Sequence, residues 1–405
     1  MKVLMLRPSY RPEISGGTHL AIDLVTDFIK AGHEVEVITP ISSEYADKID
    51  VETDECIVHR ISSKYTRQNV MTRILRYLDI SLKMYQKAKK IKCDLIMTHS
   101  MPPLLGPLGA RAGKKKKVPV LYWEQDIVSE SLISTGIFGK GGIKKKLMYA
   151  TARKLEQLTE TGSTHIITIS ELFRKMHLDR GVNQDKVSVV YNWIDTNQVY
   201  PVGRSENPLF DELNIPRNKF IVSYCGNLGV PQNVEIMVDA AEKLKMEEKL
   251  LFVIFGGGSR EEHIKKYVSS KKLRNIMMFS LQPLERAQYV YSVGDVGLVI
   301  GREGTSKNGF PSKTWSIMAA GQAMIACFDQ DSELTAFVKG GKCGIAIKPD
   351  SPDLLAETVE FMFSNQDMAK KMGKNARSFV NDYFNRERAT QKIISISENL
   401  VNSHI

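Results

Sequence analysis

Apolar and polar positions alternate between two kinds of segment along this chain, beginning with its first residues. Val3–Leu6 is an apolar run typical of a buried strand, and an amphipathic segment that ends at Ala31 follows a glycine-containing loop. Thr18 is expected to cap this helix and Gly32 to end it. Residues 33–38 then alternate polar and apolar side chains. The pattern predicts strand, loop, helix and strand, the unit of a doubly wound parallel sheet.

The same pattern continues through both halves of the chain. Residues 196–218, rich in Pro, Gly and polar side chains, predict a connection with little regular structure. We therefore expect an α/β protein with two Rossmann-like domains: an N-terminal domain over residues 1–196 and a C-terminal domain over 197–385, with a last helix in 386–405 that packs back on the first. Further buried strands are expected at 95–97, 118–123, 165–169, 187–190, 220–224, 250–255, 276–279, 296–300, 324–327 and 344–347.

Length and composition agree with two globular domains. The 405 residues suffice for two cores, and 42% hydrophobic with 25% charged residues excludes a largely disordered or fibrous chain. No apolar run approaches 18 residues, and the short apolar start is a poor signal peptide. Five scattered cysteines without C-x-x-C spacing indicate free thiols in a reducing cytoplasm.

The net charge of +10 is concentrated in the first half of the chain. Residues 60–117 contain fifteen Lys and Arg but only Asp79 and Asp94 as acidic side chains, and apolar residues recur at helical spacing over 70–85. This segment is either an interfacial helix on an anionic membrane or a core helix with a solvated cationic face. Two further basic clusters, 114–117 and 144–146, favour the membrane surface. Nucleic acid is not an expected partner, because no binding motif or stacking aromatic pattern accompanies the charge.

A glycine turn follows the first strand of each of the two predicted domains. Ser15-Gly16-Gly17 and Gly226-Asn227-Leu228-Gly229 would let backbone N–H groups approach a phosphate at a helix N-terminus. Neither is a G-x-G-x-x-G motif, and a simple tight turn is the alternative. Loop flexibility explains the third glycine cluster, Phe255–Ser259.

The segment from Asn308 to Gly321 carries the strongest candidate for chemistry. It predicts a helix that starts at Lys313 and ends at Gly321, with Ser312 as its cap. Lys313 would add a fixed positive charge to the positive end of the helix dipole, a good place for a diphosphate, or else it is a solvated surface lysine. In Asp329-Gln330-Asp331, a helix cap at Asp331 or Ser332 explains the sequence better than a metal-binding D-x-D motif.

Open parallel sheets bind ligands at the carboxyl ends of their strands, so two facing sheets are expected to share a cleft that holds the site. The chain resembles glycosyltransferase family 4 of the GT-B fold, nearest to the branch of colanic-acid, O-antigen and capsule transferases that includes the fucosamine transferase type. The resemblance rests on residues 15–17, 31–35, 167–170 and 190–195 in the first half, and on 224–229, 253–258, 279–283, 294–296, 311–313 and 318–321 in the second.

This resemblance implies transfer of a sugar from a nucleotide diphosphate donor, taken to be a UDP-sugar, to a hydroxyl acceptor, with retention at the anomeric carbon and no essential metal or other cofactor. Lys313 and the backbone of Gly16 and Gly17 would stabilise charge on the leaving phosphate. Asp126, at a strand end, would orient the acceptor or serve in acid–base chemistry, unless it is only a turn or capping residue. Further donor contacts are expected at Asn192, Gly226, Asn227, Gly229, Gln282, Asn308, Ser312 and Ser316.

The chain departs from the family pattern at two places. Asn308 and Ser316 stand where many members carry two Glu, the second of which binds the donor ribose. Residues 230–233, Val-Pro-Gln-Asn, replace the Arg and Lys that usually grip the diphosphate.

The expected activity is extension of a surface or capsular polysaccharide on a membrane-held, lipid-linked acceptor, by a protein that is peripheral on the cytoplasmic face of the plasma membrane. Two alternatives remain open: a nucleotide-sugar 2-epimerase of the same fold, and a non-catalytic partner subunit.

Overall fold

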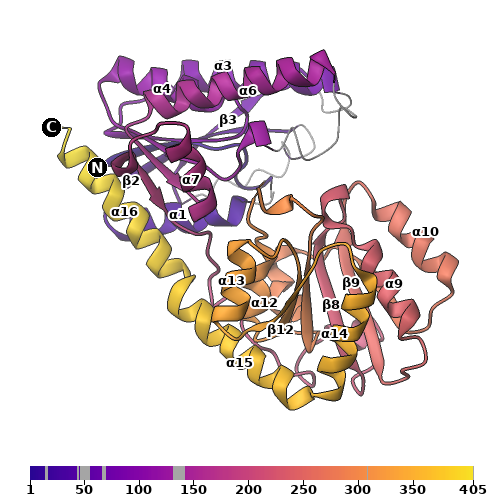
Figure 1. Cartoon of the computed structure of the whole chain (residues 1–405). Coiled ribbons are helices and arrows are strands. Elements are labelled where there is room, and N and C mark those ends of the chain that lie inside the picture. Colours follow the sequence, from indigo (N-terminus) through magenta and orange to yellow (C-terminus); the bar gives the residue numbers. More distant parts are fainter. Residues whose placement is uncertain are drawn as a thin grey trace. The chain divides into compact units, whose positions relative to one another are not determined.

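The computed structural model describes residues 1–13, 17–42, 45, 55–65, 70–130, 142–307 and 309–404. The chain divides into two compact units (Figure 1). The first unit comprises Met1–Asn192, Lys307–Gly309 and Glu387–Ile405, and the second comprises Trp193–Ser306 and Phe310–Arg386.

Seven strands of the described chain form the sheet of the first unit, in the order β3-β2-β1-β4-β5-β6-β7, and all neighbours run parallel. Leu4 of β1 pairs with Glu36 on one side and Ile96 on the other. The strands are β1 (Lys2–Leu6), β2 (Glu34–Ile41), β3 (Ile57–Ser62), β4 (Leu95–His99), β5 (Val120–Trp123), β6 (His165–Thr168) and β7 (Val187–Val189).

Helices cover both faces of this sheet (Figure 1). On one face, α3, α4 and α6 pack side by side, and α1 lies on the other. The C-terminal helix α16 contacts the α1 region through a hydrogen bond from Thr390 to Asp27 of 2.8 Å and a His33–Glu398 contact of 3.1 Å. The helices are α1 (Thr18–Lys30), α3 (Val70–Ala88), α4 (Leu105–Lys116), α6 (Ile143–Gly162), α7 (Glu171–Asp179) and α16 (Arg386–Asn402), with a short 3-10 helix η1 (Gln184–Lys186).

The second unit repeats the plan with six parallel strands in the order β10-β9-β8-β11-β12-β13. Its strands are β8 (Phe220–Asn227), β9 (Leu250–Gly257), β10 (Ile276–Ser280), β11 (Val296–Ile300), β12 (Ala323–Cys327) and β13 (Gly344–Ile347). Its helices are α8 (Leu209–Glu212), α9 (Glu235–Lys243), α10 (Glu261–Lys271), α11 (Ala287–Tyr291), α12 (Lys313–Ala319), α13 (Glu333–Gly340), α14 (Pro352–Ser364) and α15 (Gln366–Tyr383). The 3-10 helices are η2 (Val230–Gln232), η3 (Leu284–Arg286) and η4 (Thr305–Lys307).

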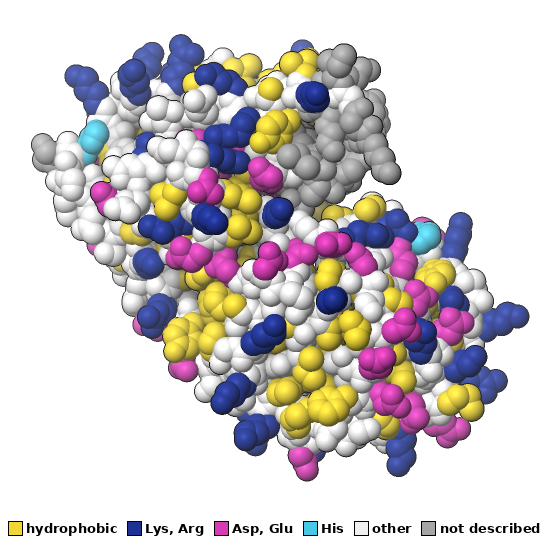
Figure 2. All heavy atoms as spheres, in the orientation of Figure 1, with side chains coloured by type: hydrophobic (Ala, Val, Ile, Leu, Met, Phe, Trp, Pro, Cys, Tyr) yellow, Lys and Arg dark blue, Asp and Glu magenta, His cyan; other side chains and the backbone are white. Residues whose placement is uncertain are grey.

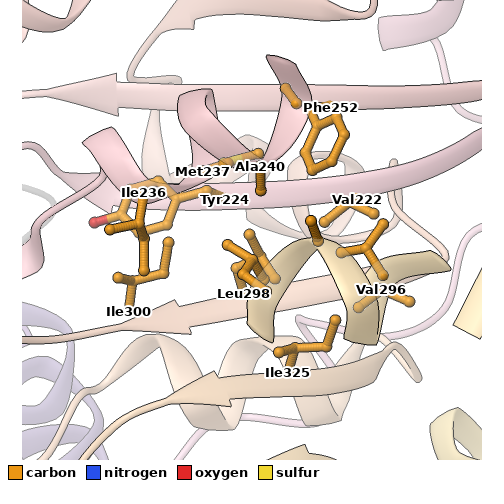
Figure 3. Packing of buried hydrophobic residues seen from close by; sticks show 14 of the residues in the cluster. Val222, Tyr224, Ile236, Met237, Ala240, Phe252, Val296, Leu298, Ile300 and Ile325 are labelled. Carbon is orange, nitrogen blue, oxygen red and sulfur yellow. The ribbon is translucent and has the colours of Figure 1, made fainter. Parts of the chain in front are cut away.

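The core of the second unit lies between its sheet and the helix layer of α9 and α14. Alternate residues of the central strands, such as Val222, Phe252 and Leu298, point into this layer, where they meet Ile236 and Met237 of α9 (Figure 3). Each is almost fully buried. Burial of these side chains stabilises the fold by about 2 kcal/mol each, which fixes the strand ends that carry the candidate site residues.

The predicted α/β fold with two doubly wound sheets is confirmed, and every predicted strand is present. One strand, β3, was not predicted, because it is a half-buried edge strand in which His59 and Arg60 interrupt the apolar pattern. Gly32, with φ of 82°, follows the end of α1 as predicted. The prediction for Thr18 is wrong: Gly17 is the N-cap residue, and the Thr18 hydroxyl bonds the Ser9 hydroxyl at 2.9 Å.

Candidate functional site

Both sheets have a point at which the strand order reverses, between β1 and β4 in the first and between β8 and β11 in the second. Loops leave such a point in opposite directions, so they leave a crevice at the carboxyl ends of the strands, where ligands bind in open α/β sheets. Most of the residues predicted for the site follow strands at or beside these two points.

In the second unit, Lys313 is a buried cation without a counter-ion. Its Nζ lies 3.7 Å from the centroid of the Tyr224 ring and has no hydrogen-bond partner among the described residues. Burial lowers the pKa of Lys313 to about 7. Burial therefore favours the neutral amine over the expected fixed positive charge in the unliganded protein. A solvated surface lysine is also excluded.

The glycine turn after β8 is shaped around this lysine. Gly226 has φ of 136°, and a Cβ atom there would lie 3.2 Å from both Cε and Nζ of Lys313. A residue with a side chain would be strained at this φ and would crowd the ammonium group. Gly226 is therefore required at the position where sequence analysis placed a phosphate-binding turn.

The residues that replace the usual Arg and Lys hold the turn in shape. The Gln232 side chain accepts hydrogen bonds from the Gly229 backbone N–H at 3.1 Å and from the Asn227 amide at 3.3 Å. Arg302, after β11, donates to the Val230 carbonyl at 2.8 Å. Three side chains on two loops thus fix the backbone beside Lys313.

Aromatic packing anchors the helix that carries Lys313. Trp315 of α12 is almost fully buried and stacks on Phe384 and Phe310, with ring centroids 4.0 and 4.9 Å apart. Helix α12 starts at Lys313, and Gly321 follows its end with φ of 70°, as predicted. Ser312 is the N-cap residue, but its exposed side chain makes no capping hydrogen bond, so its predicted capping role is wrong.

Two of the other predicted donor contacts, Ser316 and Gln282, make hydrogen bonds within the protein. Ser316 is hydrogen-bonded to the buried hydroxyl of Tyr291, which also neighbours Cys225. Burial raises the pKa of Tyr291. The Gln282 amide donates to the Ser280 carbonyl at 3.2 Å, after the edge strand β10. Asn308 lies outside the described residues.

The third glycine cluster is not explained by flexibility. A Cβ atom at Gly258, whose φ is 138°, would lie 2.3 Å from Oδ1 of Asn227, and one at Gly256 would lie 2.7 Å from Leu228. These glycines let the end of β9 approach the turn after β8, which corrects the interpretation as a flexible loop.

The segment Asp329–Asp331 has structural partners. The Asp329 carboxylate accepts from the backbone N–H groups of Gly304 and Ser306 at 2.8 and 2.9 Å, and Ser332 caps α13 as predicted. Among the described residues, no group of three or more His, Cys, Asp or Glu is placed to hold a metal ion.

In the first unit, Asp126 lies in the loop after β5. The Ser100 hydroxyl, after β4, accepts from the backbone N–H groups of Gln125 and Asp126 at 3.3 Å each and ties the two loops together. The Asp126 side chain is exposed at the surface, yet the surrounding protein atoms and the Glu124 carboxylate raise its pKa to about 6. Asp126 makes no capping bond in the described structure and can exchange a proton near neutral pH.

Asn192 and Gly17 lie at the same edge of the first sheet. Asn192, buried after β7, donates from its amide to Gln125 at 2.8 Å, while its own Oδ1 has no partner among the described residues. Gly17 is the N-cap residue of α1, and its carbonyl accepts from Nη2 of Arg7 at 3.1 Å. Gly16 lies outside the described residues.

A buried ionic network supports the loop that carries Asp126. Glu124 and His177 are each about 1% exposed and 2.8 Å apart, and His177 also lies 3.2 Å from Glu160. Burial alone would lower the pKa of His177, but the two carboxylates outweigh it and raise that pKa to about 9. His177 is therefore cationic at neutral pH and holds Glu124 in place.

Sequence reasoning missed three residues that shape these sites: Arg7, Gln232 and Arg302. Arg7 could have been identified from the sequence, since it is a charged residue that directly follows the apolar run Val3–Leu6. Arg302 carries no such signal, because its partner, the Val230 carbonyl, lies on a loop that only folding brings near, whereas Gln232 bonds the Gly229 N–H within its own turn.

The exposed face of α3 is apolar. Met71, Ile74, Leu78 and Leu82 are 65, 42, 43 and 47% exposed and follow one another at helical spacing. The buried face contains Ile80 and Met84. The structure therefore places one side of α3 in the core, as one interpretation expected, while the exposed side carries apolar residues beside Arg73.

Figure 2 shows Lys and Arg side chains gathered over the part of the first unit that contains α3, α4 and α6, with hydrophobic side chains among them. Exposed cations in this region include Arg73 on α3 and Lys114 and Lys115 at the end of α4. No helix in the described parts of the chain has the length and apolar character needed to cross a membrane.

Comparison with known proteins agrees with this geometry. The closely matching relatives include the putative colanic acid biosynthesis glycosyl transferase WcaI of Escherichia coli, 25% identical over 98% of this chain and 99% of its own. The probable glycosyltransferase WbjE of Pseudomonas aeruginosa is 24% identical over 72% of this chain and 70% of its own.

Two solved structures share the fold. Sucrose-phosphate synthase from Thermosynechococcus elongatus superposes with a TM-score of 0.79 at 16% identity, covering 99% of both chains. HepE of Anabaena, in complex with UDP, gives 0.76 at 17% identity, covering 98% of this chain and all of its own. Residues 14–198 match the family model "Glycosyltransferase Family 4" and residues 205–379 match "Glycosyl transferases group 1", so the chain belongs to the group 1 glycosyltransferases of the GT-B fold.

Proposed function

We propose that this glycosyltransferase moves a sugar from a UDP-sugar to a membrane-held, lipid-linked saccharide acceptor in the synthesis of a surface polysaccharide. The observation that carries the donor class is Lys313: a buried ammonium group without a partner among the described residues, beside a glycine turn at the switch point of a doubly wound sheet. A diphosphate is the ligand that suits a cation and backbone N–H groups in such a place. That HepE binds UDP and that WcaI is named for colanic acid biosynthesis support the finer assignment.

In the reaction proposed, the bond between the anomeric carbon and the β-phosphate oxygen breaks and UDP departs with the electron pair. The ammonium group of Lys313 stabilises the charge that develops on the phosphate, and removal of one such donor costs about 100-fold or more in rate. The acceptor hydroxyl oxygen bonds to the anomeric carbon and loses its proton. Asp126, with a pKa of about 6, is largely ionised at pH 7 and can take this proton or orient the acceptor. We propose retention at the anomeric carbon and no essential metal.

The acceptor class rests on α3. An exposed apolar stripe flanked by cations is the arrangement by which a helix lies in the interface of an anionic membrane. A protein bound in this way would meet a lipid-linked acceptor at the cytoplasmic face of the plasma membrane.

Activity is tested by incubating the protein with labelled nucleotide sugars and membrane extract. We expect UDP release together with label transferred to lipid, unaffected by EDTA, and an α-linked product from an α-linked donor in the NMR spectrum. Epimer formed without acceptor would indicate a 2-epimerase instead. The absence of any nucleotide-sugar binding in calorimetry would indicate a non-catalytic partner subunit.

Membrane binding is tested by sedimentation with vesicles of phosphatidylglycerol or phosphatidylcholine. We expect binding only to the anionic vesicles, and loss of binding when Met71, Ile74, Leu78 and Leu82 are replaced by Ser. A matched control replaces Met246 and Phe361, exposed apolar residues of the second unit that are 81 and 48% exposed, and should bind as the wild type does. Equal loss in the control would contradict the assignment of this surface to α3.

A further inference from the structure

Arg7 is a second buried cation without a counter-ion, at the switch point of the first sheet. It follows β1 directly, is 2% exposed, and its guanidinium carbon lies 4.6 Å from the centroid of the Trp123 ring. Trp123, at the end of β5, is itself almost fully buried. The guanidinium group is thus held in place by packing rather than by an ion pair.

Only one of its three nitrogen atoms makes a hydrogen bond. Nη2 donates to the Gly17 carbonyl at 3.1 Å, whereas Nε and Nη1 are buried with no partner among the described residues. An arginine kept only for structure normally uses its donors on carboxylates or carbonyls, because each unsatisfied buried donor carries the full cost of its lost hydration. The free donors of Arg7 therefore need a ligand.

Of the titratable groups described near Arg7, Tyr10 acts to raise the pKa of Arg7, but burial outweighs it and lowers that pKa. Burial and the nearby Arg7 lower the pKa of His19 to about 4 and keep the pKa of His99 well below its usual value, so both imidazoles are neutral. The N-terminus of α1, a helix of thirteen residues, lies beside Arg7 through Gly17 and adds further positive potential. Everything around the guanidinium group favours an anion.

We propose that Arg7, together with the N-terminus of α1, binds a phosphate group of a substrate. The second N–H of Nη2, together with either Nε or Nη1, forms a fork that matches two oxygens of a phosphate, and a helix N-terminus supplies backbone donors to the same anion. The site deepens the function proposed above and rests on it for the source of the phosphate, which is either the diphosphate of the donor or a phosphate that links the acceptor to its lipid.

Oxyanion binding is measured first, without turnover. Calorimetry with inorganic phosphate and pyrophosphate uses the Lys313→Met protein, so that the cation of the second unit does not contribute. We expect Arg7→Met to weaken binding at least tenfold in this background and Arg7→Lys to weaken it less. The control Arg174→Met, on α7 of the same unit, should leave binding unchanged. If Arg7→Met in the Lys313→Met background binds both anions as tightly as Lys313→Met alone does, the proposal is overturned.

Misfolding is tested on the same proteins. Because Arg7→Met removes a buried charge without a counter-ion, we expect its thermal midpoint without ligand to equal or exceed that of the parent. If Arg7→Met has a native near-UV circular dichroism spectrum and an unchanged Kd for oxyanions, Arg7 does not bind the anion. A folded protein with weakened binding would support it, and Arg7→Lys gives the same test with the charge retained.

The source of the phosphate is identified by binding UDP-glucose and farnesyl diphosphate to the wild type and to Arg7→Met. A selective loss of UDP-glucose affinity assigns the site to the donor, and a selective loss of farnesyl diphosphate affinity assigns it to the acceptor. Undiminished affinity for both would contradict a substrate site. Because these measurements need no catalysis, the oxyanion site can stand even if no sugar transfer is found.

Discussion

The two units share one arrangement, a buried cation on an aromatic ring, but differ in the chemistry of the cation. Each places a buried cation on the face of an aromatic ring at the switch point of a parallel sheet: Arg7 on Trp123 in the first unit and Lys313 on Tyr224 in the second. Burial lowers the pKa of Arg7 to about 9 and that of Lys313 to about 7. At neutral pH the guanidinium group is charged, whereas the ammonium group is only partly protonated.

If both cations bind phosphate as proposed, this difference makes one a permanent anion site and the other a conditional one. A guanidinium group keeps its charge at the cost of stability, and its flat fork suits an anion held in one orientation. A desolvated ammonium group gains its proton fully only when an anion arrives, so binding of the donor and charging of Lys313 are linked. The predictions below test the contrast between these two cations.

The largest effect is expected from removal of the titrating cation. Lys313→Met should lower kcat at least 100-fold, because the charge that stabilises the departing phosphate is lost. The same variant should raise the free energy of unfolding by about 1–3 kcal/mol without ligand. The folded-state pKa of Lys313 is lowered, so its charged form penalises the fold fully below pH 7, and the stability gain should fade as pH rises towards 10.5. Steady-state kinetics and urea unfolding at two pH values check both parts; unchanged turnover removes Lys313 from the mechanism.

The second prediction concerns pH. Donor binding should raise the pKa of Lys313, so a proton is taken up on binding between about pH 7 and that raised pKa. The affinity for UDP-glucose should therefore fall about tenfold between pH 7 and pH 8.5. Calorimetry in buffers of different ionisation enthalpy measures both the affinity and the proton uptake. Lys313→Arg, which stays charged, should bind with a flat profile, and a flat profile in the wild type would contradict the assignment.

The third prediction concerns the shape of the second site. Gly226→Ala should weaken donor binding about tenfold, because the new methyl group displaces the Lys313 side chain, and should destabilise the fold by about 1–3 kcal/mol through its backbone conformation. Gly181→Ala is the matched control, since Gly181 also has a positive φ of 85° but no neighbouring atom within 4 Å. Both variants should lose stability, and only Gly226→Ala should lose affinity. Equal affinity in the two would show that the turn does not shape the site.

The smallest effect is expected at the acceptor side. Glu124→Gln removes the negative charge that helps raise the pKa of Asp126, so that pKa should fall below 6. If Asp126 acts as a base, activity is lost as pH falls through its pKa. In Glu124→Gln the acid limb of the pH profile of kcat/KM should therefore move to lower pH, by less than one unit. The shift should be absent in Asp126→Asn, whose residual activity lacks this limb. An unmoved acid limb in Glu124→Gln would separate Asp126 from proton transfer.

Most of the fold was predictable from sequence, and the reason is local. Buried parallel strands are short apolar runs, and Gly32 and Gly321 end helices because of their positive φ. The edge strand β3 escaped prediction because a half-buried strand tolerates polar residues such as His59. Capping was less predictable: Ser332 caps α13, but Ser312 and Thr18 do not cap the helices they begin.

The site was predictable in part. Lys313 and Gly226 were found from their types and positions, but their contact depends on β8 and β11 being neighbours in the sheet. The role of the third glycine cluster was misjudged, because its need for small residues arises from the turn after β8, which lies about thirty residues away in the chain.

The sequence by itself determined the class of fold, the family resemblance and the residue types of the candidate donor site, because these follow from short-range pattern and local chemistry. Tertiary structure decided which charges are buried and what they contact. Among the described residues, it left Lys313 and Arg7 on aromatic rings without counter-ions, and it left four apolar side chains of α3 exposed while others are buried. Burial and proximity depend on residues distant in the chain, so only the folded molecule distinguishes a solvated lysine from one whose ammonium group is buried against an aromatic ring.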